Sequence, residues 1–165
     1  MMNGAFAALT IILLGYITVT ILYNYILAAA YFLIRERRSN PHTSVHTFCI
    51  LVPAHNEELL IGSLLDSIHA IDYPRDKYSV VVIADNCNDK TDVIARSKGV
   101  QCLNRMDKDR KGKGFALDWA LNHMDLDSCD AVLVVDADSV VDVRILRELD
   151  QSLIRGSQVV QCNNA

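Results

Sequence analysis

The sequence predicts an α/β domain with a mostly parallel sheet and helices on both faces, preceded by one transmembrane helix. Residues 5–34 are almost wholly apolar, and a membrane span needs about 20 such residues. Beyond them, short Val- and Ile-rich runs alternate with segments of helical periodicity, which is typical of a parallel sheet. Several of these runs end in polar loops, which places candidate functional residues at one sheet edge.

The N-terminal segment favours a retained membrane anchor over a cleaved signal peptide. The first 34 residues contain no Lys, Arg, Asp or Glu. A signal peptide would have a basic leading segment, a shorter apolar core and a small-residue cleavage site. We therefore expect residues 5–34 to contact the lipid bilayer as a single-pass span.

A basic flank follows the span directly. Arg35, Arg37 and Arg38 stay on the cytoplasmic side by the positive-inside rule, so the rest of the chain is predicted to be cytoplasmic. The predicted division is an anchor with its basic flank over residues 1–38, a linker over residues 39–47 and an α/β domain over residues 48–165.

The composition of the chain excludes some classes of partner. There are 16 basic and 20 acidic residues, for a net charge of −4. A nucleic-acid-binding protein would show a basic patch, so no nucleic acid is expected as a partner. The five cysteines show no CxxC spacing and are predicted to be reduced thiols in a reducing compartment.

The elements of the α/β domain follow from apolar periodicity and from residues that end helices and strands. Asn56 and Asp142 are each predicted to cap the helix that follows. Apolar runs that lack helical periodicity are short enough to be strands. The predicted strands cover residues 48–52, 79–84, 100–103, 131–135 and 158–162, and the predicted helices follow residue 56, cover 91–97 and 115–124, and follow residue 142.

An acidic pair ends the apolar run that begins at Ala131. The run predicts a buried parallel strand, and Asp136 and Asp138 lie at its carboxyl end. Side chains two apart on an extended strand point the same way, so the two carboxylates repel unless a cation lies near them. Mg²⁺ or Mn²⁺ suits such oxygen ligands. A solvated turn is the alternative for this segment.

Three further loops fall at the same predicted edge or precede a helix. Residues 53–57 and 85–89 follow the first two strands, and residues 110–114 combine cationic side chains with glycines before a helix. The last loop suits a phosphate group, although a solvated charge run gives the same pattern. Neither a P-loop nor a GxGxxG motif is present, which argues against a dinucleotide-dependent oxidoreductase.

Segments 53–57, 85–89, 112–114 and 136–138 resemble, in this order, the signatures of family 2 glycosyltransferases. The resemblance covers residues 48–165. It implies a Rossmann-like GT-A fold, a UDP-sugar donor and a divalent metal, Mg²⁺ or Mn²⁺. It also implies hexosyl or N-acetylhexosaminyl transfer to a hydroxyl of a glycan or lipid-linked acceptor, in cell-surface polysaccharide or glycan synthesis.

The same resemblance assigns donor-binding roles to seven positions and metal binding to two. It implies that Pro53, Ala54 and His55 line the base pocket, Glu57 lies beside the ribose and base, Asp85 binds the base, Lys113 lies near the ribose or diphosphate, Asp136 contacts the ribose or metal, and Asp138 ligates the metal.

The sequence departs from the family where a general base is expected. Family members usually carry a further acidic residue after the metal motif, whereas Asp142, Glu148 and Asp150 all fall in a predicted helix. We therefore expect the chain to be truncated and to contain the donor-binding half of a glycosyltransferase domain. The general base is not assigned to any residue of this chain. A positioned base typically contributes about 10²–10⁴-fold to the rate.

Two alternatives remain open. In a haloacid-dehalogenase-type phosphatase, Asp136 would be the nucleophile and Asp138 the acid/base, although the later Lys that such a site needs is absent. A membrane-anchored nucleotide-binding fragment without catalysis shares every predicted contact with the transferase. Only turnover distinguishes that fragment from an enzyme.

Overall fold

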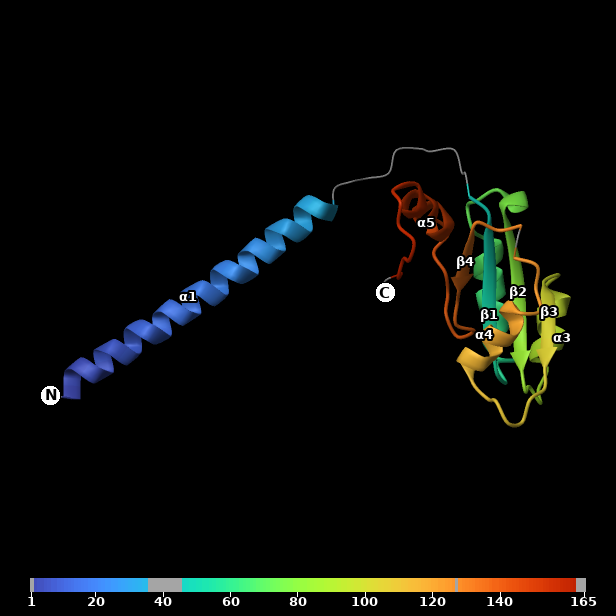
Figure 1. Ribbon diagram of the computed structural model, residues 1–165, viewed down its shortest axis with the longest axis horizontal. Coiled ribbons are helices and arrows are strands. Elements are labelled where there is room, and N and C mark those ends of the chain that lie inside the picture. The colour runs from blue at the N-terminus through green and yellow to red at the C-terminus, as the bar shows by residue number, and fades with distance from the viewer. Residues whose placement is uncertain (1, 36–45, 127, 163–165) are drawn as a thin grey trace. The chain divides into compact units, whose positions relative to one another are not determined.

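The computed structural model describes residues 2–35, 46–126 and 128–162. The chain divides into two compact units, residues 1–41 and 42–165. Figure 1 shows helix α1 (Met2–Arg35) in the first unit and the sheet in the second. The linker predicted over residues 39–47 and the arginines Arg37 and Arg38 fall largely outside the described residues.

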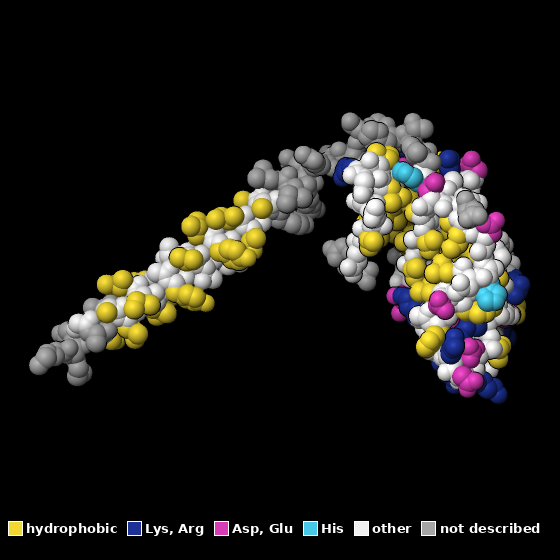
Figure 2. Space-filling model, in the orientation of Figure 1, with side chains coloured by type: hydrophobic (Ala, Val, Ile, Leu, Met, Phe, Trp, Pro, Cys, Tyr) yellow, Lys and Arg dark blue, Asp and Glu magenta, His cyan; other side chains and the backbone are white. Residues whose placement is uncertain are grey.

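Helix α1 contains a stretch, Ala8–Ala30, that is long and apolar enough to cross a membrane. This criterion concerns length and composition alone, and a signal sequence meets it as well. Figure 2 shows hydrophobic side chains along the helix and no charged ones among its coloured residues. Such a helix satisfies its backbone hydrogen bonds internally, as a lipid environment requires.

Four parallel strands form the sheet, in the order β3-β2-β1-β4. Strand β1 is central, and six of its seven residues are buried. Because all the strands are parallel, their carboxyl ends meet at one edge, the lower edge in Figure 1. The strands are β1 (Phe48–Ala54), β2 (Tyr78–Asp85), β3 (Gln101–Arg105) and β4 (Ala131–Val134).

Helices cover both faces of the sheet, as the sequence predicts. The side chains of β1 alternate between the faces, so Ile50 and Val52 contact one apolar cluster while Cys49 and Leu51 contact another. Three helices share the first cluster, and α4 packs with the second. The helices are α2 (Ile61–His69), α3 (Thr91–Ser97), α4 (Lys113–Leu121) and α5 (Ile145–Ile154), and a short 3₁₀ turn, η1 (Arg75–Lys77), precedes β2.

Strand β4 differs from the prediction of a strand buried on both faces. It lies at the edge of the sheet, where Leu133 packs against the first cluster. Val132 and Val134 point to the face that carries α4, and they are 42% and 40% exposed. Helix α4 packs against β1 and β2, so the described residues leave this part of the face open to solvent.

The two predicted helix caps are also wrong, since α2 and α5 begin at Ile61 and Ile145. Asn56 takes a left-handed conformation, φ 57°, which asparagine tolerates better than most residues. Its Oδ1 accepts a hydrogen bond from Asn88 N at 2.8 Å, which ties two loops together. Asp142 Oδ1 accepts from Arg144 N at 2.8 Å, one residue before α5.

The last predicted strand, over residues 158–162, does not form. The described residues of this segment have no strand structure, and Val159 is 92% exposed. An isolated extended segment gains stability only from a neighbouring strand or an apolar surface. No strand pairs with residues 158–162 among the residues that the structure describes.

Candidate functional site

A cavity of about 710 Å³ lies at the carboxyl edge of the sheet, which is where the ligands of open α/β sheets bind. The loops after β1, β2 and β3 and the start of α4 form its wall. The lining residues are Pro53, Ala54, His55, Asp85, Asn86, Asn88, Met106, Lys108, Lys111, Gly112, Lys113 and Ala116.

The cavity brings together five of the seven residues predicted to bind the donor: Pro53, Ala54, His55, Asp85 and Lys113. Glu57 and Asp136 are not part of the lining, although Asp136 forms an ion pair with Lys113. The polar residues in the loops indicated which strand ends would line a binding site. They gave no indication that Met106 and Lys108, in the loop after β3, would also line the cavity.

Asp89 holds the loops after β1 and β2 together. Its Oδ1 accepts from the backbone N of Thr91 at 3.0 Å and from Thr91 Oγ1 at 2.6 Å, and its Oδ2 accepts from Glu58 N at 3.0 Å. Thr91 Oγ1 in turn accepts from Glu57 N at 2.8 Å. Burial raises the pKa of Asp89, but the hydrogen bonds from Thr91 and Glu58 together leave this pKa below its usual value.

Asp85, at the end of β2, is only 5% exposed and lines the cavity. Its Oδ1 accepts hydrogen bonds from Arg105 Nη1 at 2.6 Å and from Asn86 Nδ2 at 2.9 Å. Asp85 and Arg105 are register partners on β2 and β3, so their side chains can leave the sheet on the same side. Sequence patterns assign no role to Arg105, and its place two residues beyond the predicted strand 100–103 is the signal that could have indicated one.

The backbone around Asn86 completes this corner of the site. Asn86 takes a left-handed conformation, φ 51°, and its N donates to Arg105 O at 2.8 Å. Asn86 Oδ1 accepts from Asp107 N at 2.9 Å. The hydrogen bond that Arg110 N donates to Asp107 is the main reason that the pKa of Asp107 is lowered. These contacts fix the start of the loop after β3 against the end of β2.

The imidazole of His55 lines the cavity and is held by hydrogen bonds at both ring nitrogens. His55 Nδ1 lies 2.6 Å from Asp85 O, and because a carbonyl oxygen can only accept, Nδ1 carries the proton. Asn56 Nδ2 donates a longer hydrogen bond, 3.4 Å, to His55 Nε2. The ring is exposed, so its face is available to a planar ligand group.

Cationic groups form another wall of the cavity. Lys108, Lys111 and Lys113 all line it, and Lys113 is the first residue of α4. Gly112 precedes the helix with φ 110°, a conformation that residues with a Cβ rarely adopt. The N–H groups of the first helical turn add partial positive charge, so this wall favours an anion such as a phosphate group.

The acidic pair after β4 is exposed, and its neighbours are not. Val135 and Ala137 are buried at 7% and 5%, so Asp136 and Asp138 point away from the core. Asp136 Oδ1 is paired with Lys113, whereas its Oδ2 and the carboxylate of Asp138 form no hydrogen bond or ion pair among the described residues. These oxygens fit Mg²⁺ or Mn²⁺, which usually keep water or phosphate oxygens among their ligands. The described residues contain no group of three or more His, Cys, Asp or Glu side chains that could hold a metal by themselves.

The acidic residues after Asp138 do not line the cavity. Asp150 is 3% exposed, and its Oδ1 lies 2.7 Å from Nδ1 of His46, two residues before β1. This position is at the amino end of β1, opposite the edge that carries the cavity. Asp142 and Glu148 are exposed at the start of α5. The structure therefore offers none of the three as a base at the cavity.

The fold and the site define a Rossmann-like α/β domain that presents polar and cationic loops at the carboxyl edge of its sheet. Residues 46–165 match the family model described as glycosyltransferase like family 2, and the chain belongs to that family. The match supports the transferase interpretation over the phosphatase alternative.

Curated relatives match between about a half and three fifths of the chain. It is 33% identical over 104 residues to beta-monoglucosyldiacylglycerol synthase of Synechocystis sp., covering 61% of this chain and 22% of the relative. It is 37% identical over 90 residues to 4,4'-diaponeurosporenoate glycosyltransferase of Staphylococcus aureus, covering 54% of this chain and 23% of the relative. The chain thus spans less than a quarter of each of these two relatives.

Solved glycosyltransferase structures share the fold. S. aureus TarS 1-349 in complex with UDP-GlcNAc has a TM-score of 0.55 and 26% identity, covering 66% of this chain and 31% of TarS. The mannosyltransferase PcManGT of Pyrobaculum calidifontis, in complex with GDP-Man and Mn²⁺, has a TM-score of 0.54 and 25% identity. The match covers 82% of this chain and 42% of PcManGT. Both support a GT-A fold for this chain.

Proposed function

We propose that this chain is the donor-binding part of a membrane-anchored glycosyltransferase. In this proposal it binds a UDP-sugar with a divalent metal, and the sugar passes to a hydroxyl of a glycan or lipid-linked acceptor. The observation that carries the proposal is the cavity, which combines a buried carboxylate, an exposed imidazole and a cationic wall at the strand ends.

The lining of the cavity contains groups that suit both parts of a nucleoside diphosphate. The carboxylate of Asp85 is an acceptor for a base N–H, and the face of His55 is available for stacking, as histidine does with unstacked bases. Lys111 and Lys113 lie on the wall that favours phosphate groups. Pro53 and Ala54 add apolar surface to the lining.

Asp136 and Asp138 are the residues that would hold the metal. When bound, a divalent cation offsets negative charge on the departing diphosphate. Lys113 adds a further positive charge at this position, because its Nζ pairs with the Asp136 carboxylate. Glu57 stays beside the donor site through its backbone bond to Thr91, and we propose that it contacts the ribose.

The acceptor is proposed from the relatives and from the N-terminal helix. One relative is named for a diacylglycerol lipid, and TarS is named for a poly(ribitol-phosphate) substrate. A transferase that acts on such molecules benefits from a membrane anchor, which Ala8–Ala30 is long enough to provide. We propose that the α/β domain is cytoplasmic.

Titration calorimetry of the full chain in detergent, with UDP in the presence and absence of Mn²⁺, tests the proposed donor site. We expect metal-dependent binding in the unmodified chain. Asp138→Asn should abolish the metal dependence, because it removes one of two charged oxygen ligands. Asp142→Asn is the matched control, since Asp142 is also exposed and its carboxylate bonds only Arg144 among the described residues.

Equal effects of the two substitutions would contradict the assignment of the metal site. Absence of UDP binding by a folded sample would contradict the donor site itself. Release of free sugar or product from a UDP-sugar then separates an active transferase from a fragment that only binds nucleotide. A chain without a positioned base should turn over slowly.

A further inference from the structure

We propose that Arg105 is a positioning residue that sets the base preference of the donor site. It holds the Asp85 carboxylate so that one oxygen is presented to the cavity as a hydrogen-bond acceptor. The ligand class selected is a pyrimidine nucleotide whose ring carries an N–H, as uracil does. This inference rests on the proposed binding of a nucleoside diphosphate in the cavity.

The two oxygens of Asp85 have different surroundings. Oδ1 accepts from both Arg105 Nη1, at 2.6 Å, and Asn86 Nδ2, at 2.9 Å. Oδ2 makes no hydrogen bond with any residue that the structure describes, yet the residue lines the cavity. Rotation of the carboxylate to exchange its two oxygens would break both hydrogen bonds to Oδ1, from Arg105 and from Asn86. Oδ2 is thus left as a fixed acceptor for a ligand.

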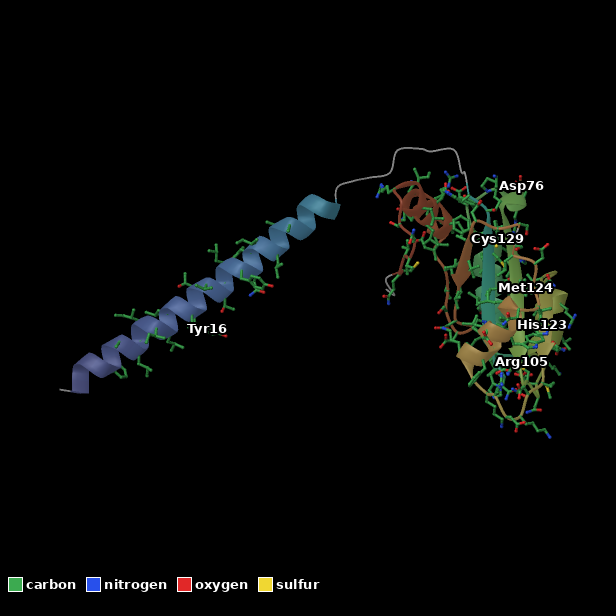
Figure 3. All side chains as sticks on the ribbon, viewed as in Figure 1. Tyr16, Asp76, Arg105, His123, Met124 and Cys129 are labelled. Atoms are coloured by element: carbon green, nitrogen blue, oxygen red, sulfur yellow. The ribbon has the colours of Figure 1, made fainter. Side chains whose placement is uncertain are left out.

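Arg105 is itself anchored by the loop that follows it. Its Nη2 donates to Asp107 Oδ2 at 2.8 Å and to Arg110 O at 2.7 Å. Its side chain is only 4% exposed, so water competes little for these bonds. Figure 3 shows Arg105 at the lower end of the sheet, where β2 and β3 end, and Asp76 at the opposite end. The guanidinium therefore connects Asp85 to the cavity loop that carries Met106 and Lys108.

Stability alone does not account for this arrangement. Replacing a buried ion pair by well-packed apolar residues is often neutral or stabilising. In addition, Arg105 Nε is buried and has no hydrogen-bond partner among the described residues, which is an unfavourable state for a charged group. Local rules of this kind are broken mainly at functional sites. The pair is better explained by the carboxylate that it orients.

The fixed acceptor distinguishes between pyrimidine bases. Uracil has a ring N–H at N3, which can donate to Asp85 Oδ2. Cytosine has an unprotonated nitrogen at that position, whose lone pair would face the carboxylate. A site built to bond one N–H discriminates strongly against an analogue that lacks it, because a buried polar group is then unpaired. We therefore expect a preference for UDP over CDP that depends on Arg105.

The experiment compares the affinities of UDP, CDP and inorganic pyrophosphate for the full chain in detergent with Mn²⁺. Arg105→Met should weaken UDP binding by at least about tenfold, because it leaves the buried Asp85 carboxylate without its cationic partner. It should also bring the ratio of UDP to CDP affinity close to one, while pyrophosphate binding stays unchanged. Arg96→Met is the control, since Arg96 is exposed and its side chain bonds only Cys102 O, at 3.1 Å, among the described residues.

Arg96→Met should change all three affinities by no more than about twofold. A variant Arg105→Met that binds pyrophosphate normally is folded at the site. If it fails to fold, Arg105→Lys keeps the charge but not the forked geometry, and it should still lower the ratio of UDP to CDP affinity. If a folded Arg105 variant keeps the ratio of UDP to CDP affinity unchanged, this inference is overturned and the proposed function is not. Absence of UDP binding in the unmodified chain would overturn the proposed function and this inference together.

Discussion

Single residues in the loops determine the shape of the site, and Asp89 shows how. Its carboxylate accepts from Thr91 and from the backbone of Glu58, while Thr91 holds the backbone of Glu57. Thr91 is completely buried, so its hydroxyl has no alternative partner in water. These bonds fix the loops after β1 and β2, which contribute His55 and Asp85 to the cavity.

Asp89→Asn should lower the free energy of unfolding by about 1 kcal/mol at pH 7, because the amide has one acceptor oxygen where Asp89 uses both of its carboxylate oxygens. The pKa of Asp89 is lowered in the folded chain, so its ionised form stabilises the fold above the unfolded pKa of about 3.9. This stabilisation is lost as the pH falls through the lower folded value. Urea unfolding from pH 7 to pH 3 measures both effects.

The difference between the unmodified chain and Asp89→Asn should therefore shrink below about pH 4. Asp118→Asn is a suitable control, since Asp118 is exposed and its carboxylate accepts only a 3.4 Å hydrogen bond from Asn122 among the described residues. We expect it to change stability by less than about 0.5 kcal/mol. A constant difference between Asp89→Asn and the unmodified chain across this pH range would contradict the role of the ionised carboxylate.

At the scale of elements, β1 and β4 differ in how fully they are covered. β1 has paired strands on both sides and helices on both faces. β4 is paired with β1, and among the described residues only one of its faces packs against an apolar cluster. The same apolar residue types therefore contribute different amounts of stability in the two strands.

Ile50→Ala in β1 should cost about 2–5 kcal/mol of unfolding free energy, because Ile50 is completely buried and its removal leaves a cavity. Val134→Thr in β4 should cost less than about 0.5 kcal/mol, since Val134 is 40% exposed. Chemical denaturation of the two variants measures the contrast. Similar costs at both positions would show that the α4 face of β4 is covered in solution.

At the scale of the whole molecule, the proposed topology can be tested with the cysteines. Cys162 is exposed, whereas burial raises the pKa of the thiols of Cys49, Cys87, Cys102 and Cys129. Maleimides react with the thiolate, so Cys162 should be labelled fastest. A cytoplasmic domain predicts that a membrane-impermeant maleimide labels Cys162 only after the cells are permeabilised. Cys162→Ser should lose that signal, and labelling in intact cells would place the domain outside.

Several features of the fold could be predicted from the sequence because they depend on neighbours in the chain. The bounds of α3, residues 91–97, match the prediction, since its periodicity and Gly99 are local signals. The mostly parallel sheet followed from alternating strand and helix patterns. The start of α2 could not be predicted, because Asn56 bonds the loop after β2 and not the helix that follows it in sequence.

The sequence by itself determined the α/β class, the apolar N-terminal helix and the order of the loops that meet at the cavity. These depend on composition, on periodicity and on the rule that parallel strands share one carboxyl edge. Only the tertiary structure decided which partners those loops have. Asp85 and Arg105 are 20 residues apart and meet because β2 and β3 are in register, and the exposed face of β4 follows from its place at the sheet edge. Such contacts depend on distance in space, which sequence patterns do not encode.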